Sequence, residues 1–144
     1  MWALVISLFS FANPTSAAEQ VYPVTGVWVA VDTRYPAAAG EVCLAVKTFG
    51  MEAARKAVSE LTIFSDNKRY DVKGPIETRA TVKSIKPRDG GFWITEVSSK
   101  PHRWFAIRTK IRYFLAILDF KTIEIRDSRS TTRYTKCGPR KPTI

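Results

Sequence analysis

The feature that most constrains this chain is a series of short period-two runs between residues 24 and 137. The runs are rich in Val, Ile, Thr, Tyr, Phe and Trp, and turn residues such as Asp66-Asn67 and Lys73-Gly74-Pro75 separate several of them. Such runs are typical of half-buried β-strands joined by tight turns. We predict strands at Val24–Asp32, Glu41–Thr48, Glu60–Ser65, Ile76–Ile85, Gly91–Ser98, Arg103–Thr109, Ile111–Asp119, Thr122–Arg126 and Thr131–Cys137.

Short antiparallel strands leave two unpaired edges unless their sheet closes on itself. The short connections favour neighbours in a meander. The sequence therefore predicts an all-β fold, a small antiparallel up-and-down β-barrel of about eight strands. One segment interrupts the pattern, because residues 51–58 contain good helix formers directly after Gly50. It predicts one short helix between the second and third strands.

The first eighteen residues predict an export signal that is not part of the fold. Trp2–Ala12 is almost wholly apolar, and Asn13-Pro14 ends this run before the small residues Thr15–Ala18. This is the order of a secretory signal peptide, and the run is too short to span a bilayer. We expect removal of residues 1–18, with residues 19–144 forming one barrel domain that has a short basic C-terminal tail. The mature protein is then periplasmic or secreted and has no transmembrane segment.

Cysteine content indicates a structural link. Cys43 and Cys137 are the chain's two cysteines, and two cysteines allow a single pairing. An exported chain meets an oxidising compartment, so we predict a Cys43–Cys137 disulfide. The alternative is a reactive thiol, but the chain has no CxxC spacing, and its single histidine, His102, has no evident link to either cysteine.

Gly26-Val27-Trp28 opens the first predicted strand. At this point the chain resembles the lipocalins and the wider calycin superfamily, whose first strand enters the barrel with a G-x-W motif. The resemblance implies that Gly26 and Trp28 form the barrel floor and that a basic side chain of the last strand covers the indole. Arg133 takes that covering position, with Arg126 as the alternative, because an indole face attracts a guanidinium.

Charge is a second indication of function, because the chain carries a formal net charge of +10. A charge of this size attracts anionic partners. Arg79 and Lys83 share one face of their predicted strand, and Arg108, Lys110 and Arg112 alternate in the same way further on. These five residues are the candidate contacts to an anionic surface. They form one patch only if their strands are neighbours.

The aromatic residues between Phe92 and Phe114 are interleaved with cations and admit two interpretations. They could form a stacking platform for nucleic acid or glycan, or two hairpins whose rings face the core. No RNP-like signature is present, so we favour the hairpins and argue against nucleic acid as a partner. Residues 111–118 are apolar on both faces after Arg112, which makes Phe114, Ala116 and Leu118 candidates for a dimer contact.

The sequence offers little for catalysis. His102 lies in a Pro-His turn, no serine occupies a nucleophile elbow, and no cluster has metal-ligand spacing. We therefore expect no metal, no cofactor and no enzymatic activity. The leading hypothesis is an exported binding protein that holds a small hydrophobic or amphipathic ligand in the barrel mouth. The alternative is a basic interaction protein that binds an anionic envelope surface, a polysaccharide or a protein partner.

Overall fold

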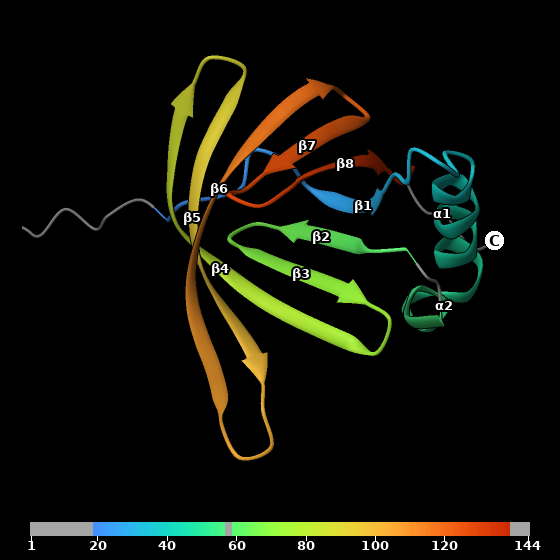
Figure 1. Cartoon of the computed structure of the whole chain (residues 1–144), viewed down its shortest axis with the longest axis horizontal. Coiled ribbons are helices and arrows are strands. Elements are labelled where there is room, and N and C mark those ends of the chain that lie inside the picture. The colour runs from blue at the N-terminus through green and yellow to red at the C-terminus, as the bar shows by residue number, and fades with distance from the viewer. Residues whose placement is uncertain (1–18, 57–58, 139–144) are drawn as a thin grey trace, which may run out of the picture.

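Eight strands form a closed antiparallel barrel with the strand order β1 to β8, in a computed structural model that describes residues 19–56 and 59–138 (Figure 1). The predicted small β-barrel is confirmed. The expected export signal and the basic tail beyond Gly138 lie outside the described residues. In chain order the elements are β1 (Gly26–Ala30), α1 (Ala38–Phe49), α2 (Met51–Lys56), β2 (Leu61–Ser65), β3 (Lys68–Lys73), β4 (Ile76–Arg88), β5 (Gly91–Pro101), β6 (Ala106–Asp119), β7 (Thr122–Arg126) and β8 (Thr131–Lys136).

The barrel closes at β1, which pairs with β2 on one edge and with β8 on the other. Trp28 faces Thr62 of β2 and Lys136 of β8. Alternate residues of a barrel strand point inward, so each strand has an inner and an outer row. The inner rows form the barrel core, and the outer rows meet either the helices or solvent.

Glu41–Thr48 is helical, so its assignment as a strand is wrong. It lies within α1, where Ala39, Cys43 and Val46 are buried. Steps of four and three residues follow the period of a helix rather than that of a strand. Both helices consequently lie between β1 and β2, not between the second and third strands. Among the described residues, no helix has the length and apolar character needed to span a bilayer.

Helix α1 and the start of α2 cover the outer row of β1, β2 and β3. Val29, Leu61 and Val72 lie side by side on these strands and pack against Cys43 and other buried residues of α1. The predicted disulfide is confirmed, and it links Cys43 of α1 to Cys137, which directly follows β8. The chain-entropy model limits the stabilisation from closing so long a loop to about 4–5 kcal/mol.

β3 is a strand that the sequence pattern did not predict. Its inner row carries Arg69 and Asp71, so the usual order of apolar inside and polar outside is reversed. Asp71 accepts a hydrogen bond from Thr62 Oγ1 at 2.6 Å and one from Arg69 Nη2 at 2.7 Å. These contacts satisfy polar groups that would otherwise be costly to bury.

A buried ion pair lies at the centre of the barrel. Arg69 Nη2 is 2.9 Å from Oε1 of Glu96, whose side chain is 0% exposed. The hydroxyls of Tyr22 and Tyr113 donate to Glu96 Oε2 at 2.6 and 3.0 Å. The apolar residues packed in the same core are Val24, Trp28, Phe64, Val82, Ile94, Leu115, Ile123 and Tyr134. The barrel interior is therefore packed with side chains of the protein itself.

Two of the predicted strands form a single long one. β6 continues from Ala106 to Asp119, and residues 102–105 form the turn that joins it to β5. β6 pairs with β5 along most of its length but with β7 only from Phe114 onward. The β5–β6 hairpin therefore projects beyond the barrel, as its position in the lower part of Figure 1 shows.

The buried carboxyl predicts an unusual pH dependence of stability. Burial raises the pKa of Glu96 above its ordinary value of 4.5, although Arg69 and two tyrosines favour the charged form. A carboxyl with a raised native pKa stabilises the fold at low pH and loses that contribution as the pH rises through the native pKa. We therefore expect the unfolding free energy of wild type, relative to Glu96→Gln, to fall as the pH increases above 4.5.

Urea unfolding of both proteins over a pH series measures this difference. Glu41→Gln, at an exposed position of α1, controls for the loss of a surface carboxyl. A difference that grows with pH would mean that attraction to Arg69 outweighs burial.

Candidate anion-binding surface

The outer rows of β4, β5 and β6 bring cations and aromatic rings together. In the strand register, Lys86 faces Trp93, Trp93 faces Phe114, and Phe114 faces Arg126 of β7. In the same outer row of β6, Lys110 and Arg112 precede Phe114. We call this region the β4–β6 face and define it by Lys83, Lys86, Trp93, Lys110, Arg112 and Phe114.

Trp93 is the centre of this face. Phe114 meets it edge-on, with 5.4 Å between the ring centroids and an interplanar angle of 65°. The guanidinium carbon of Arg112 lies 4.6 Å from the Trp93 centroid, and that of Arg126 lies 5.8 Å from the Phe114 centroid. A guanidinium held over a ring keeps its N–H edges free to bind phosphate, sulfate or carboxylate.

Two open cavities meet at Trp93 and Arg112, which line both of them. The first has a volume of about 750 Å³ and is lined by the three lysines of the face. The second has a volume of about 860 Å³, and its charged residues are of both signs. They are Arg112, Arg88, Asp89, Arg126 and Asp127. Within the described part of the chain, neither Arg112 nor any of the three lysines forms an ion pair.

The five predicted anionic-surface contacts lie on two strands that flank β5. Lys83, Lys110 and Arg112 line the first cavity. Arg79 and Arg108 lie further along the same rows, where both face Ser99 of β5. Arg79 is also 3.6 Å from a carboxylate oxygen of Glu77. The strands are close neighbours because β4 and β6 both pair with β5.

Lys86 and Trp93 were not among the predicted contacts, although the sequence contains a signal for them. Asp89-Gly90 is a two-residue turn of the kind that joins hairpin strands. Counting outward from that turn pairs Lys86 with Trp93, which is the observed register. Phe114 was considered only as a dimer contact.

Trp28 is almost fully buried at the end of the barrel where β1 begins. Its Nε1 donates to the Thr25 carbonyl at 3.1 Å. Gly26 has a φ of 94°, a conformation that side chains rarely allow. The cation over the indole is Lys136 of the last strand, whose Nζ lies 5.4 Å from the ring centroid.

Arg133 does not cover Trp28, which corrects the position expected from the lipocalin resemblance. Tyr134 points into the core, so the neighbouring Arg133 points outward. There it binds Glu124 at 2.8 Å, and Arg126 binds the same carboxylate at 2.8 Å.

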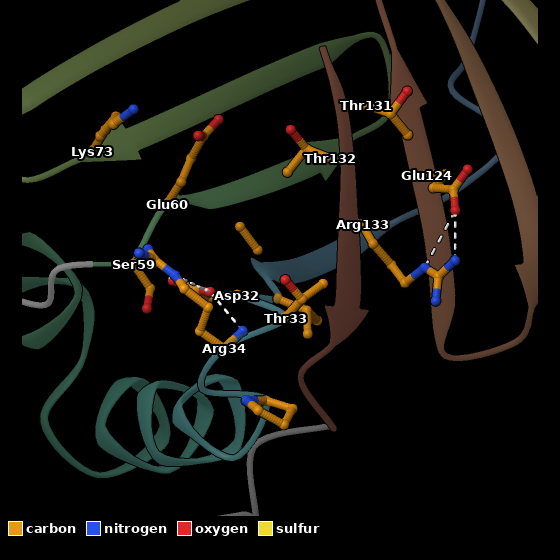
Figure 2. A pocket seen from close by; sticks show the side chains of 13 residues that line it. Asp32, Thr33, Arg34, Ser59, Glu60, Lys73, Glu124, Thr131, Thr132 and Arg133 are labelled. Carbon is orange, nitrogen blue, oxygen red and sulfur yellow. Dashed lines mark hydrogen bonds and ion pairs between the residues drawn. The ribbon is translucent and has the colours of Figure 1, made fainter.

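The barrel mouth, the end where β1 stops and β8 begins, contains a cavity of about 880 Å³ whose lining side chains are mostly polar (Figure 2). Four of its six charged groups form two ion pairs, whereas Glu60 and Lys73 form none within the described residues. Arg34 is 2.9 Å from Asp32, and Arg133 is 2.8 Å from Glu124. Its charged groups are three cations and three carboxylates, so this mouth offers less to an anionic partner than the unpaired cations of the β4–β6 face.

The remaining predicted features have clear positions. His102 is an exposed turn residue, as expected, and its ring stacks on that of Phe105 with 4.9 Å between centroids. Ala116 is buried, whereas Leu118 is 46% exposed, and the dimer contact stays a prediction. In residues 19–56 and 59–138, no group of three His, Cys, Asp or Glu side chains could hold a metal ion.

The fold and this surface define the chain as a small disulfide-linked β-barrel protein with a basic and aromatic outer face. No family model, curated protein or solved structure matches the chain. The resemblance to the lipocalins rests on Gly26, Trp28 and the meander of strands, and it stays a prediction.

Removal of the buried indole should destabilise the barrel strongly. We expect Trp28→Ala to lower the unfolding free energy by roughly 3–5 kcal/mol, because it leaves a large cavity in the core. Lys136→Met removes only the cation over the ring and should cost about 1 kcal/mol or less. Chemical unfolding measures both variants. An unchanged stability of Trp28→Ala would rule out its role in closing the barrel floor.

Proposed function

We propose that this protein is a non-enzymatic interaction protein that binds a polyanionic surface through the β4–β6 face. The observation that carries the proposal is the cluster of unpaired cations around Trp93, with Arg112 stacked on the indole between three lysines. Cations without carboxylate partners repel one another, and an anionic partner relieves that repulsion. The rings add apolar contact area that does not depend on charge.

The packed interior supports an exterior binding mode. Tyr22, Glu96 and Tyr113 bind one another inside the barrel, where an enclosed ligand would otherwise lie. The charged groups that line the mouth are three cations and three carboxylates, so they leave no excess of cations there. The outer face is thus the region of the described chain best suited to an anion.

An exported compartment fits this proposal. The Cys43–Cys137 disulfide supports the export that residues 1–18 predict, because disulfides persist in oxidising compartments. The partner class is then a polyanion outside the cytoplasm, such as an acidic polysaccharide or the charged surface of an envelope.

Charge reversal on the face tests the proposal. Lys83→Glu combined with Lys110→Glu places two carboxylates in the lysine-lined cavity. We expect affinity for dextran sulfate to fall at least about tenfold, because each cation near an anionic surface contributes roughly 1 kcal/mol. Titration at several ionic strengths should also show steep weakening with salt in the wild type.

The matched control is Lys47→Glu combined with Lys56→Glu, which makes the same change in net charge on α1 and α2. These helices cover β1 to β3, across the barrel from the β4–β6 face. If both double variants lose the same affinity, the interaction depends on net charge and not on this face. If neither does, the proposed function is wrong.

A second candidate function is capture of an amphipathic ligand, here beside α1 and not in the barrel mouth where the sequence led us to expect it. A cavity of about 760 Å³ between α1 and the β1–β8 pair favours it. Apolar side chains such as Val27, Val46 and Phe120 line this cavity together with Lys47 and Lys136. An apolar pocket with a few cations suits an anionic head on an apolar tail.

Native mass spectrometry tests this second candidate. Protein exported by a bacterial host should retain an excess mass of roughly a few hundred daltons if the cavity holds such a ligand. Phe120→Asp, which places a carboxylate in the cavity, should lower that occupancy. Equal native and denatured masses before and after incubation with oleate would contradict ligand capture.

A further inference from the structure

The end of the β5–β6 hairpin is separate from the barrel core. Its outermost pairs are Lys100 with Ile107 and Pro101 with Ala106, whereas β4 pairs with β5 only as far as Ser99. Every residue from 100 to 110 is exposed. In Figure 1 this hairpin extends below the barrel and away from α1 and α2.

Large apolar side chains occupy the tip. Trp104 is 91% exposed, Phe105 62% and Ile107 45%. The turn has a defined shape without core contacts, because the His102 N–H donates to the Phe105 carbonyl at 2.9 Å and the two rings stack. Exposed rings concentrated at one projecting turn indicate an interaction site.

The chain around this tip carries cations and no carboxylate. Between Glu96 and Asp119 the sequence contains no Asp or Glu. Its Lys and Arg residues in that interval are Lys100, Arg103, Arg108, Lys110 and Arg112. None of them forms an ion pair with another residue of the described ranges. Three lie in the outer row of β6, which connects the tip to the β4–β6 face.

This combination matches the interface of an anionic bilayer. Trp and Phe rings favour the boundary between headgroups and acyl chains, where apolar and polar surroundings meet. Lys and Arg beside them bind acidic headgroups while their stems stay in apolar surroundings. A soluble polyanion would engage the cations but would leave Trp104 and Phe105 in water.

We infer that the tip of the β5–β6 hairpin inserts into the interfacial layer of an anionic lipid bilayer. Trp104 and Phe105 enter that layer, and the cations of β6 bind lipid phosphates. The inference rests on the proposed function and names the anionic surface as a lipid membrane.

Vesicle binding by tip variants tests the inference. The probes are vesicles of phosphatidylcholine mixed with phosphatidylglycerol, vesicles of phosphatidylcholine alone, and dextran sulfate. We expect Trp104→Ser combined with Phe105→Ser to lower affinity for the mixed vesicles at least about tenfold and to leave dextran sulfate binding unchanged. Because both positions are exposed, the variant should keep the wild-type melting temperature.

The matched control removes two exposed apolar side chains of α1, away from the hairpin. Leu44 is 65% exposed and Phe49 is 74% exposed. Leu44→Ser combined with Phe49→Ser should bind mixed vesicles as the wild type does. Brominated acyl chains should quench wild-type tryptophan fluorescence, and Trp104→Phe should lose part of that quenching while keeping its affinity.

Each outcome distinguishes the two proposals. Insertion is overturned if the tip variant keeps its affinity for vesicles or if Trp104→Phe keeps its full quenching. In that case, binding to dextran sulfate still supports the proposed function. Equal wild-type binding to vesicles of phosphatidylcholine alone overturns the requirement for anionic lipid. Wild-type protein that binds dextran sulfate but no vesicle overturns the membrane as partner. Binding to none of the three probes overturns the proposed function itself.

Discussion

Closure of the sheet between β1 and β8 is the constraint on which the rest of this structure depends. β1 pairs on both edges, so the ring of strands is complete and its inner rows are shielded from water. The enclosed space contains Arg69 and Glu96, and a buried charge is strongly unfavourable when its partner is missing. Two tyrosine hydroxyls donate to one oxygen of this carboxyl, Glu96 Oε2. The interior is thus filled by contacts within the protein, which favours a binding site on the outside of the barrel.

Unequal strand lengths create the features on the outside. β4, β5 and β6 contain 13, 11 and 14 residues, whereas β1, β2 and β7 contain 5 each. The outer rows of β4 and β6 flank β5, and their cations Lys83, Lys86, Lys110 and Arg112 form no ion pair within the described residues. Like charges on nearby strands oppose folding, and an anionic partner would remove that cost. On this face, the repulsion between cations that lowers the stability of the unbound protein also favours binding of an anionic partner.

Alternation of side chains predicted the strands wherever one row is apolar, as at Gly91–Ser98 and Thr122–Arg126. It failed at β3 because Arg69 and Asp71 face inward, and the groups that neutralise them come partly from strands distant in the sequence. It failed at Glu41–Thr48 because valines there suggest a strand. A helix is favoured instead, since it places Ala39, Cys43 and Val46 on one face against β1 and β2. The sequence predicted five cations as surface contacts, but it did not predict that their strands lie close together.

By itself, the sequence determined the strand-rich fold, the single possible disulfide, the excess of cations and the burial of Trp28. These properties follow from residue types and local spacing. Only the tertiary structure decided that β4 and β6 flank β5, that Lys136 rather than Arg133 covers Trp28, and that Trp104 ends a projecting hairpin. These outcomes depend on strand register and on unequal strand length. A tight turn such as Asp89-Gly90 fixes the register of its own hairpin, but strand length and the pairing of distant strands depend on contacts between residues far apart in the chain.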